Sequence, residues 1–192
     1  MNVLAINGSP RKKGNTSTLI RAMLEGAEAC GAETAEAHLH GLNMKGCMGC
    51  LSCRKIYGIC AQKDELSPFL EAVKTADAVI FGCPIYMYRI SGQMKLYIDR
   101  SYSLYTPREG GGYNSAVQAG KRFALAISQG APDPEQYQRS IRWLAGMAGT
   151  GHGMQEIGRI VHVNGESRPA ATDEALLAEA RAIGRRLAGA GV

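Results

Sequence analysis

Short apolar segments alternate along this chain with stretches that have the spacing of amphipathic helices, and this alternation restricts the possible folds most strongly. The apolar segments are residues 2–7, 78–81, 123–127 and 157–163, and residues 33–39 form a fifth that alternates weakly. Strands that are apolar along their whole length are typical of a parallel sheet covered by helices on both faces. The sequence therefore predicts an α/β fold with a five-stranded parallel sheet in the middle of three layers.

Helices are predicted between these strands from apolar residues at helical spacing. The first helix ends near Gly31, three more cover residues 67–73, 91–102 and 135–147, and the capping run 172–174 begins the last. Residues 105–120 contain Pro107 and three consecutive glycines, so we expect a long mobile loop there.

Length and composition fit one globular domain. The chain has 192 residues, of which 45% are hydrophobic and 20% charged, so we expect a single domain over 1–192 with a cysteine-rich insertion loop at about 43–63. The net charge of +5 comes from scattered basic residues, so we expect no nucleic-acid partner. No secretory signal and no apolar run long enough to cross a bilayer are visible, which predicts a cytoplasmic protein without a membrane partner.

The loop after the first strand has the chemistry of a phosphate site. It reads Gly8-Ser-Pro-Arg-Lys-Lys-Gly-Asn-Thr-Ser-Thr18 and leads into a predicted helix. Its hydroxyls can donate hydrogen bonds, Arg11 can pair with a phosphate through two N–H groups, and a helix N-terminus offers free amides. The loop lacks the lysine of the nucleoside-triphosphate pattern, and Pro10 replaces the second glycine of the dinucleotide pattern. A monophosphate is the ligand that remains.

Two motifs resemble those of a known family. Gly8-Ser-Pro-Arg11 followed by Asn15-Thr16 matches the form G-S-x-R-x-x-x-N-T, and Cys83-Pro-Ile-Tyr-Met-Tyr88 followed by Ser91-Gly-Gln-Met-Lys95 is similar to a flavin-contacting segment and the helix after it. The chain therefore resembles the flavodoxin-like NADPH-dependent FMN reductase family. The resemblance implies a flavodoxin-like three-layer sandwich and an oxidoreductase that moves electrons from NAD(P)H through bound FMN to a quinone, a flavin or a redox protein.

The same resemblance implies a set of FMN-binding residues. The phosphate would lie at the first loop, the ring system would lie against the segment after the third strand, and residues ending the fourth strand would form the opposite wall. These residues are Ser9, Arg11, Asn15, Thr16 and Ser17; Pro84, Ile85, Tyr86 and Met87; and Ser128, Gln129 and Gly130. No catalytic side chain is expected, because the flavin carries the chemistry. The family's oligomers imply a homodimer or homotetramer in which residues 105–120 border the flavin and a partner subunit.

Four cysteines form the most specific cluster in the sequence. Cys47, Cys50, Cys53 and Cys60 fall within 14 residues at spacings of x2, x2 and x6. Three cysteines at x2 spacing are typical of ferredoxin-type loops that wrap an iron-sulfur cluster, whereas zinc usually takes cysteine pairs with a longer spacer. The loop resembles the iron-sulfur flavoprotein branch of the family, which implies a [4Fe-4S] cluster. Reduced structural thiols are the alternative.

Two other functions fit parts of the sequence. A flavodoxin-like electron carrier would bind FMN without turning over NADPH. A cysteine phosphatase would use Cys83 as nucleophile and Arg89 on phosphate, because the two residues form a C-x5-R pattern between a strand and a helix. Pro84 removes an amide from such a phosphate loop, and the bulky residues that follow obstruct close approach. Cys83 is therefore expected to be a packed thiol.

Overall fold

Five parallel strands form the main sheet of the computed structural model, which describes residues 1–56 and 58–190. They are β1 (Asn2–Asn7), β2 (Glu33–His38), β3 (Ala78–Tyr86), β7 (Arg122–Ser128) and β8 (Gln155–His162). Their order in space is β2-β1-β3-β7-β8, the 2-1-3-4-5 order of flavodoxin-like doubly wound sheets. The predicted α/β fold with five parallel strands is confirmed.

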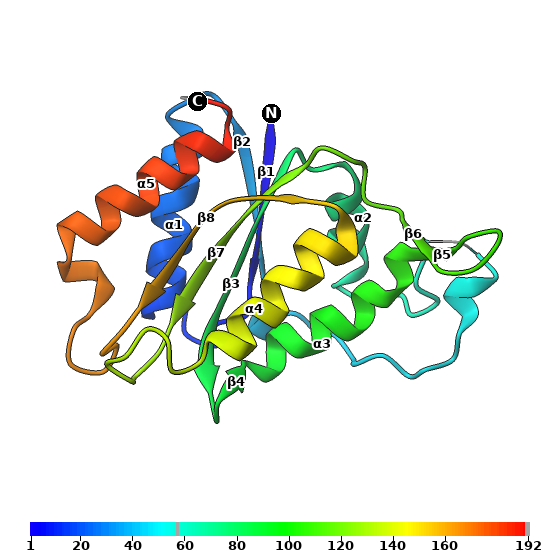
Figure 1. Cartoon of the computed structure of the whole chain (residues 1–192), viewed down its shortest axis with the longest axis horizontal. Coiled ribbons are helices and arrows are strands. Elements are labelled where there is room, and N and C mark those ends of the chain that lie inside the picture. The colour runs from blue at the N-terminus through cyan, green and yellow to red at the C-terminus, as the bar shows by residue number, and fades with distance from the viewer. Residues whose placement is uncertain (57, 191–192) are drawn as a thin grey trace.

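Helices cover both faces of this sheet (Figure 1). On one face lie α1 (Asn15–Glu28) and α5 (Glu174–Leu187), and on the other lie α2 (Ser67–Thr75), α3 (Gly92–Ser101) and α4 (Gln138–Gly146). Shorter helical turns are η1 (Leu39–Gly41), η2 (Ser52–Arg54), η3 (Tyr102–Leu104), the π-helical η4 (Met147–Gly151) and η5 (Ala170–Thr172).

Alternating side chains divide the core between the two faces. In β7, Phe123, Leu125 and Ile127 pack toward α3 and α4, whereas Ala124 and Ala126 face α1 and α5. Small residues on the second face let the two helices lie close to the sheet. Since both faces are buried, the strand is apolar over residues 123–127, which is the pattern that the sequence displayed.

The chain connections place a crevice between β1 and β3. The connection after β1 runs through α1 on one face, and the connection after β3 runs through α3 on the other. In doubly wound sheets, such a reversal opens a crevice at the carboxyl ends of the strands, and ligands bind there. The loops after β1 and β3 meet at this edge of the sheet.

Three segments differ from the sequence predictions. Residues 105–120, predicted as a loop, include a short hairpin of β5 (Tyr105–Pro107) and β6 (Tyr113–Ser115). The sequence did not predict this hairpin, because strands of three residues are too short to show a period. The helix predicted over 135–147 begins at Gln138 and continues into η4. Finally, β4 (Arg89–Ile90) turns back on the end of β3 as an antiparallel sixth strand. Among the described helices, none combines the length and apolarity needed to cross a bilayer.

Candidate functional site: a pocket at the carboxyl edge of the sheet

The loop between β1 and α1 is held in one conformation by hydrogen bonds among its own residues. The carbonyl of Arg11 accepts from the Gly14 amide at 3.0 Å and from the Ser17 hydroxyl at 2.8 Å. The Ser9 amide donates to the buried Asn7 side chain at 2.9 Å. Gly8 lies so close to the start of α3 that an added Cβ would come within 2.8 Å of Met94 Cβ. The loop is therefore held in shape by the protein's own groups.

Helix α1 begins at this loop without a capping side chain. Its N-cap is Gly14, which has no side chain to accept a hydrogen bond from the first amides, and its first turn contains no acidic residue. Free amides and the positive end of the helix dipole favour an anion there. Arg11 is exposed beside them and is the only cation among the residues that line the pocket. This end of the pocket can bind a phosphate group.

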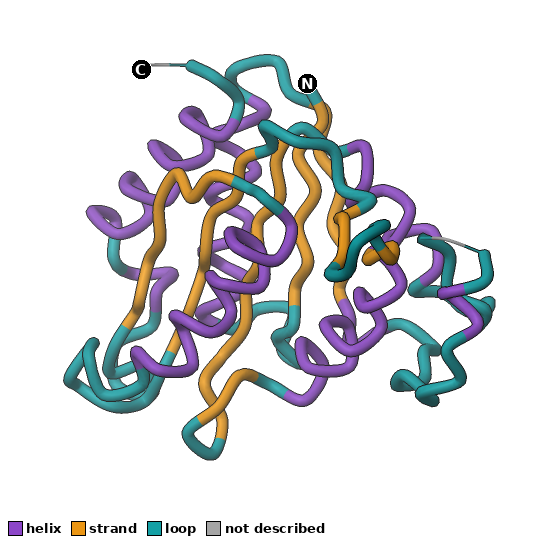
Figure 2. The backbone as a smooth tube through the Cα atoms, turned by 45° about the vertical axis from the view of Figure 1, so that its right-hand side comes forward, coloured by secondary structure: helices purple, strands orange, loops and turns teal. Residues whose placement is uncertain are grey.

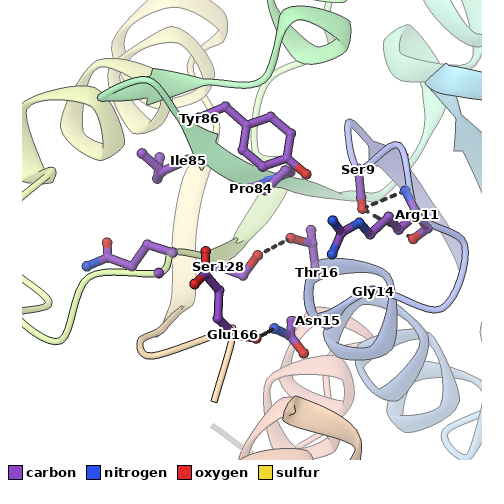
Figure 3. A pocket seen from close by; sticks show the side chains of 13 residues that line it. Ser9, Arg11, Gly14, Asn15, Thr16, Pro84, Ile85, Tyr86, Ser128 and Glu166 are labelled. Atoms are coloured by element: carbon purple, nitrogen blue, oxygen red, sulfur yellow. Dashed lines mark hydrogen bonds between the residues drawn. The ribbon is translucent and has the colours of Figure 1, made fainter. Parts of the chain in front are cut away.

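The pocket itself has a volume of about 340 Å³, within the range of small-molecule sites. Figure 3 shows that it lies between the β1–α1 loop, the end of β3 and the loop after β7. Its lining residues are Ser9, Arg11, Gly14, Asn15, Thr16, Pro84, Ile85, Tyr86, Ser128, Gln129, Gly130, Gly165 and Glu166. The structure thus brings together ten of the twelve residues that the sequence predicted as the FMN site.

One wall of the pocket comes from the β3–β4 hairpin. Pro84, Ile85 and Tyr86 line the pocket, and Ile85 is paired with Ile90 across the hairpin. Met87 lies at the tip, is 88% exposed and is not a lining residue. Met87 and Tyr88 both have left-handed backbones, with φ of 45° and 65°, which two-residue hairpin turns require but bulky side chains disfavour. The tight turn therefore directs Met87 away from the cavity.

The opposite wall carries an unpaired acceptor. The side-chain nitrogen of Gln129 donates to the carbonyls of Ala131 and Asp133, which fixes the orientation of the amide. Its Oε1 is buried and has no hydrogen-bond partner among the described residues. A buried acceptor without a partner is costly unless a ligand supplies a donor. The ring system of FMN carries an N–H group that can do so, and this observation fits the cofactor to the pocket.

Two predicted residues serve as structural ties. Asn15 lines the pocket, but its side chain donates to the Gly165 carbonyl at 2.7 Å and accepts from the Ala170 amide at 2.9 Å. Ser17 is buried, donates to the Arg11 carbonyl, accepts from Asn7 and does not line the pocket. Both side chains hold neighbouring loops in place around the pocket.

Other residues of the site were missed in the sequence. Gly165 and Glu166 line the pocket from the loop after β8, and Asn7 anchors the phosphate-binding loop from beneath. The sequence signal that could have found Gly165 and Glu166 is their position directly after a predicted strand, because residues that follow parallel strands lie at the same edge of the sheet. Thr16 and Ser128 share a hydrogen bond of 2.7 Å that joins the first turn of α1 to the end of β7.

Cys83 is not a nucleophile in this fold. Its side chain is fully buried, and burial raises its pKa to about 12, so the thiol stays protonated at neutral pH. Arg89 donates to the Ser140 hydroxyl at 3.2 Å and does not line the pocket. The phosphatase alternative has no support, and Cys83 is the packed thiol that the sequence predicted.

The cysteine-rich loop lies beyond α3, away from α5 and β8 (Figure 2). All four of its cysteines are free, and they line one small cavity of about 50 Å³ together with Arg100. A hydrogen bond from Ser52 is the main cause that lowers the pKa of Cys50. Among the described residues, no three His, Cys, Asp or Glu side chains are arranged as a metal site. The donor set of four thiols fits a [4Fe-4S] cluster in kind and number.

The base of this loop is closed by Arg100, which comes from the last turn of α3. Its guanidinium donates to both carboxylate oxygens of Asp64, at 2.6 and 3.1 Å, and to the carbonyls of Lys45 and Gln62. Burial by itself raises the pKa of Asp64, but the hydrogen bonds from Arg100 and Lys45 outweigh it and hold that pKa below its usual value. Asp64 is therefore ionised at neutral pH.

Known proteins resemble this chain in sequence. The family model described as NADPH-dependent FMN reductase matches residues 1–165. An iron-sulfur flavoprotein of Archaeoglobus fulgidus is 42% identical over 101 residues, which cover 53% of this chain and 49% of that protein. The chain thus spans about half the length of the curated relatives it matches.

Solved structures show the same fold at low sequence identity. An NAD(P)H:quinone oxidoreductase from Methanothermobacter marburgensis is 18% identical, with a TM-score of 0.74, and the match covers 97% of this chain and 96% of that one. An FMN-dependent NADH-azoreductase from Bacillus anthracis, solved in complex with FMN, is also 18% identical, with a TM-score of 0.71 and coverage of 98% and 100%. The flavodoxin-like fold predicted from the sequence is confirmed.

Proposed function

Because this chain belongs to the NADPH-dependent FMN reductase family, we propose that it is an FMN-dependent oxidoreductase that takes electrons from NAD(P)H. The observation that carries the proposal is the uncapped N-terminus of α1, which faces the same 340 Å³ pocket as Arg11. Bound FMN would supply the redox chemistry. This chain's own residues bind and orient it, so no catalytic side chain is needed.

Each end of the pocket suits one part of FMN. The α1 amides, the Ser9 hydroxyl and Arg11 would bind the phosphate, and Pro84 with Tyr86 would lie against the ring system. Gln129 Oε1 would accept a hydrogen bond from the ring. Tyr86 is 45% exposed, so this side stays open to an electron donor or to a small-molecule or protein acceptor. Names of similar proteins point to quinones or azo compounds as acceptors.

An anaerobic spectrum followed by a turnover assay tests this function. Protein purified without oxygen should show flavin absorbance, and NADPH or NADH should bleach it and sustain turnover with a quinone. Colourless protein that takes up no added FMN would refute the proposal. Flavin that binds but is never reduced by either nucleotide would identify a flavodoxin-like electron carrier instead.

We further propose that Cys47, Cys50, Cys53 and Cys60 hold a [4Fe-4S] cluster. Support comes from the shared cavity that these thiols line and from the iron-sulfur flavoprotein names of the relatives. Reconstituted protein should bind about four iron and four sulfide per chain, and Cys50→Ser should lose them while keeping FMN. Four thiols that remain free to titrate after reconstitution would show that the cysteines are structural.

A further inference from the structure

The two ends of the cysteine-rich loop are fastened to each other. The Gln62 side chain donates to the Gly46 carbonyl at 3.0 Å, and the Asn43 amide donates to Glu65 at 2.6 Å. The amides of Lys45 and Leu66 both donate to Asp64. All four cysteines lie between these fastened ends. The loop base therefore sets how far apart the first and last cysteines can move.

Arg100 is the one residue from outside the loop whose side chain hydrogen-bonds to both ends of this base among the described residues. It reaches Lys45 on the side before Cys47 and reaches Gln62 and Asp64 on the side after Cys60. Its side chain is fully buried, so the ion pair with Asp64 is shielded from solvent. Four donated hydrogen bonds use the planar fork of a guanidinium, which a lysine ammonium cannot reproduce.

One donor of Arg100 is left over. Its Nε is buried without a hydrogen-bond partner among the described residues, and Arg100 lines the same cavity as the four thiols. A buried N–H group without a partner is costly, and the sulfur atoms that line the same cavity are the acceptors that could satisfy it. Thiolate ligands of a cluster are acceptors and carry negative charge, which a guanidinium beside them would balance.

We propose that Arg100 is the positioning residue of the cysteine loop: it clamps the two ends of the loop together and places its free N–H and its charge beside the thiols that bind the cluster. Only the second part, the placement of the N–H group and the charge beside the thiols, rests on the proposed cluster. Closure of the loop base is a property of the protein without iron.

Hydrogen exchange of the iron-free protein tests the clamp. In Arg100→Lys, the protection factors of the Lys45, Leu66 and Asn43 amides should fall at least tenfold. The matched control is Arg159→Lys, which alters another arginine–carboxylate pair, with Glu156 on β8, and should leave these amides unchanged. Unchanged protection in Arg100→Lys overturns the clamp.

Reconstitution tests the second half. Arg100→Lys should retain several-fold less iron and sulfide than the wild type, with FMN binding unchanged because the pocket is formed by other residues. The double variant Arg100→Leu/Asp64→Leu removes both charges together and so avoids leaving a buried carboxylate unpaired. The two opposite charges largely cancel, but the variant also lacks the Arg100 N–H group, so any cluster that it binds should have a more negative reduction potential. A wild-type potential and full iron content in both variants overturn this half.

The two arms separate the inference from the proposed function. If the wild-type protein binds no iron, the cluster proposal and the second half fail together. The exchange measurement then decides whether Arg100 closes the loop around structural thiols.

Discussion

Arg11 is the residue whose loss should weaken FMN binding most selectively. It is the only cation that lines the pocket in the described part of the chain, and one charge-assisted hydrogen-bond pair contributes about 2 kcal/mol. Arg11→Ala should therefore raise the Kd for FMN about thirtyfold, measured by quenching of flavin fluorescence. Lys12→Ala is the control, because Lys12 neighbours Arg11 but does not line the pocket. Equal effects of both variants would mean that the overall positive charge of the loop, and not a direct contact with Arg11, attracts the phosphate.

His152 should make stability depend on pH. It is 2% exposed, stacks on Tyr105 at 4.7 Å between ring centroids and is bonded to Ser115, and burial lowers its pKa from 6.5 to about 4. Below pH 6.5 the unfolded chain binds this proton and the folded chain does not, so stability falls as pH falls from about 6.5 to 4. The full loss is about 3 kcal/mol.

Urea unfolding at several pH values checks this expectation. His152→Phe should flatten the profile between pH 6.5 and 4, leaving the smaller contribution of His162, whose pKa burial also lowers. His40→Gln, at an exposed position, should leave the profile as it is in the wild type. A wild-type profile that is already flat would show that His152 titrates normally.

The contact between α1 and α5 depends on two glycines. A Cβ added at Gly184 would lie 1.9 Å from the Met23 carbonyl oxygen, and one added at Gly26 would lie 2.1 Å from the Arg181 carbonyl oxygen. Both neighbours are backbone atoms and cannot move without shifting a helix. Gly184→Ala should therefore destabilise the protein by about 2–3 kcal/mol in urea unfolding, despite the higher helix propensity of alanine.

Gly146 supplies the matched control for this substitution. It ends α4, and an added Cβ there would meet no atom within 4 Å. Gly146→Ala should be neutral or stabilise by up to about 1 kcal/mol. If both variants have the same stability, the helices are free to separate and the close contact is not required.

Elements that are buried on both faces could be predicted from the sequence, whereas elements defined by a few hydrogen bonds could not. Burial makes β3 and the interior of β7, residues 123–127, apolar, so composition alone marks them. The β5–β6 hairpin leaves no such mark, because each strand is three residues long. For the pocket, motifs identified the loops after β1 and β3. Gly165 and Glu166 line the pocket because the order of the strands brings the loop after β8 to the same edge of the sheet, and no local motif indicates that order.

The tip of the β3–β4 hairpin is expected to be covered in a homo-oligomer. Tyr86, Met87 and Tyr88 are 45%, 88% and 64% exposed, which is an unusual concentration of large apolar side chains beside a ligand pocket. Met87→Asp should shift the protein toward monomer in sedimentation velocity, raising the dissociation constant at least tenfold. Met48→Asp, at another exposed methionine in the cysteine-rich loop, should not. A wild-type protein that sediments as a monomer with FMN tightly bound would contradict a homo-oligomer that covers this hairpin.

The pocket is built from four segments that are far apart in the chain, at residues 9–16, 84–86, 128–130 and 165–166. An unfolded chain therefore offers the flavin almost nothing, and the ligand selects the folded population by mass action. With free FMN at one hundred times its Kd, the folded state gains about 2.7 kcal/mol. The flavin supply of a cell would thus govern how much of this protein escapes degradation as well as its catalytic rate. A pulse-chase measurement under riboflavin limitation would reveal a shorter half-life of the protein.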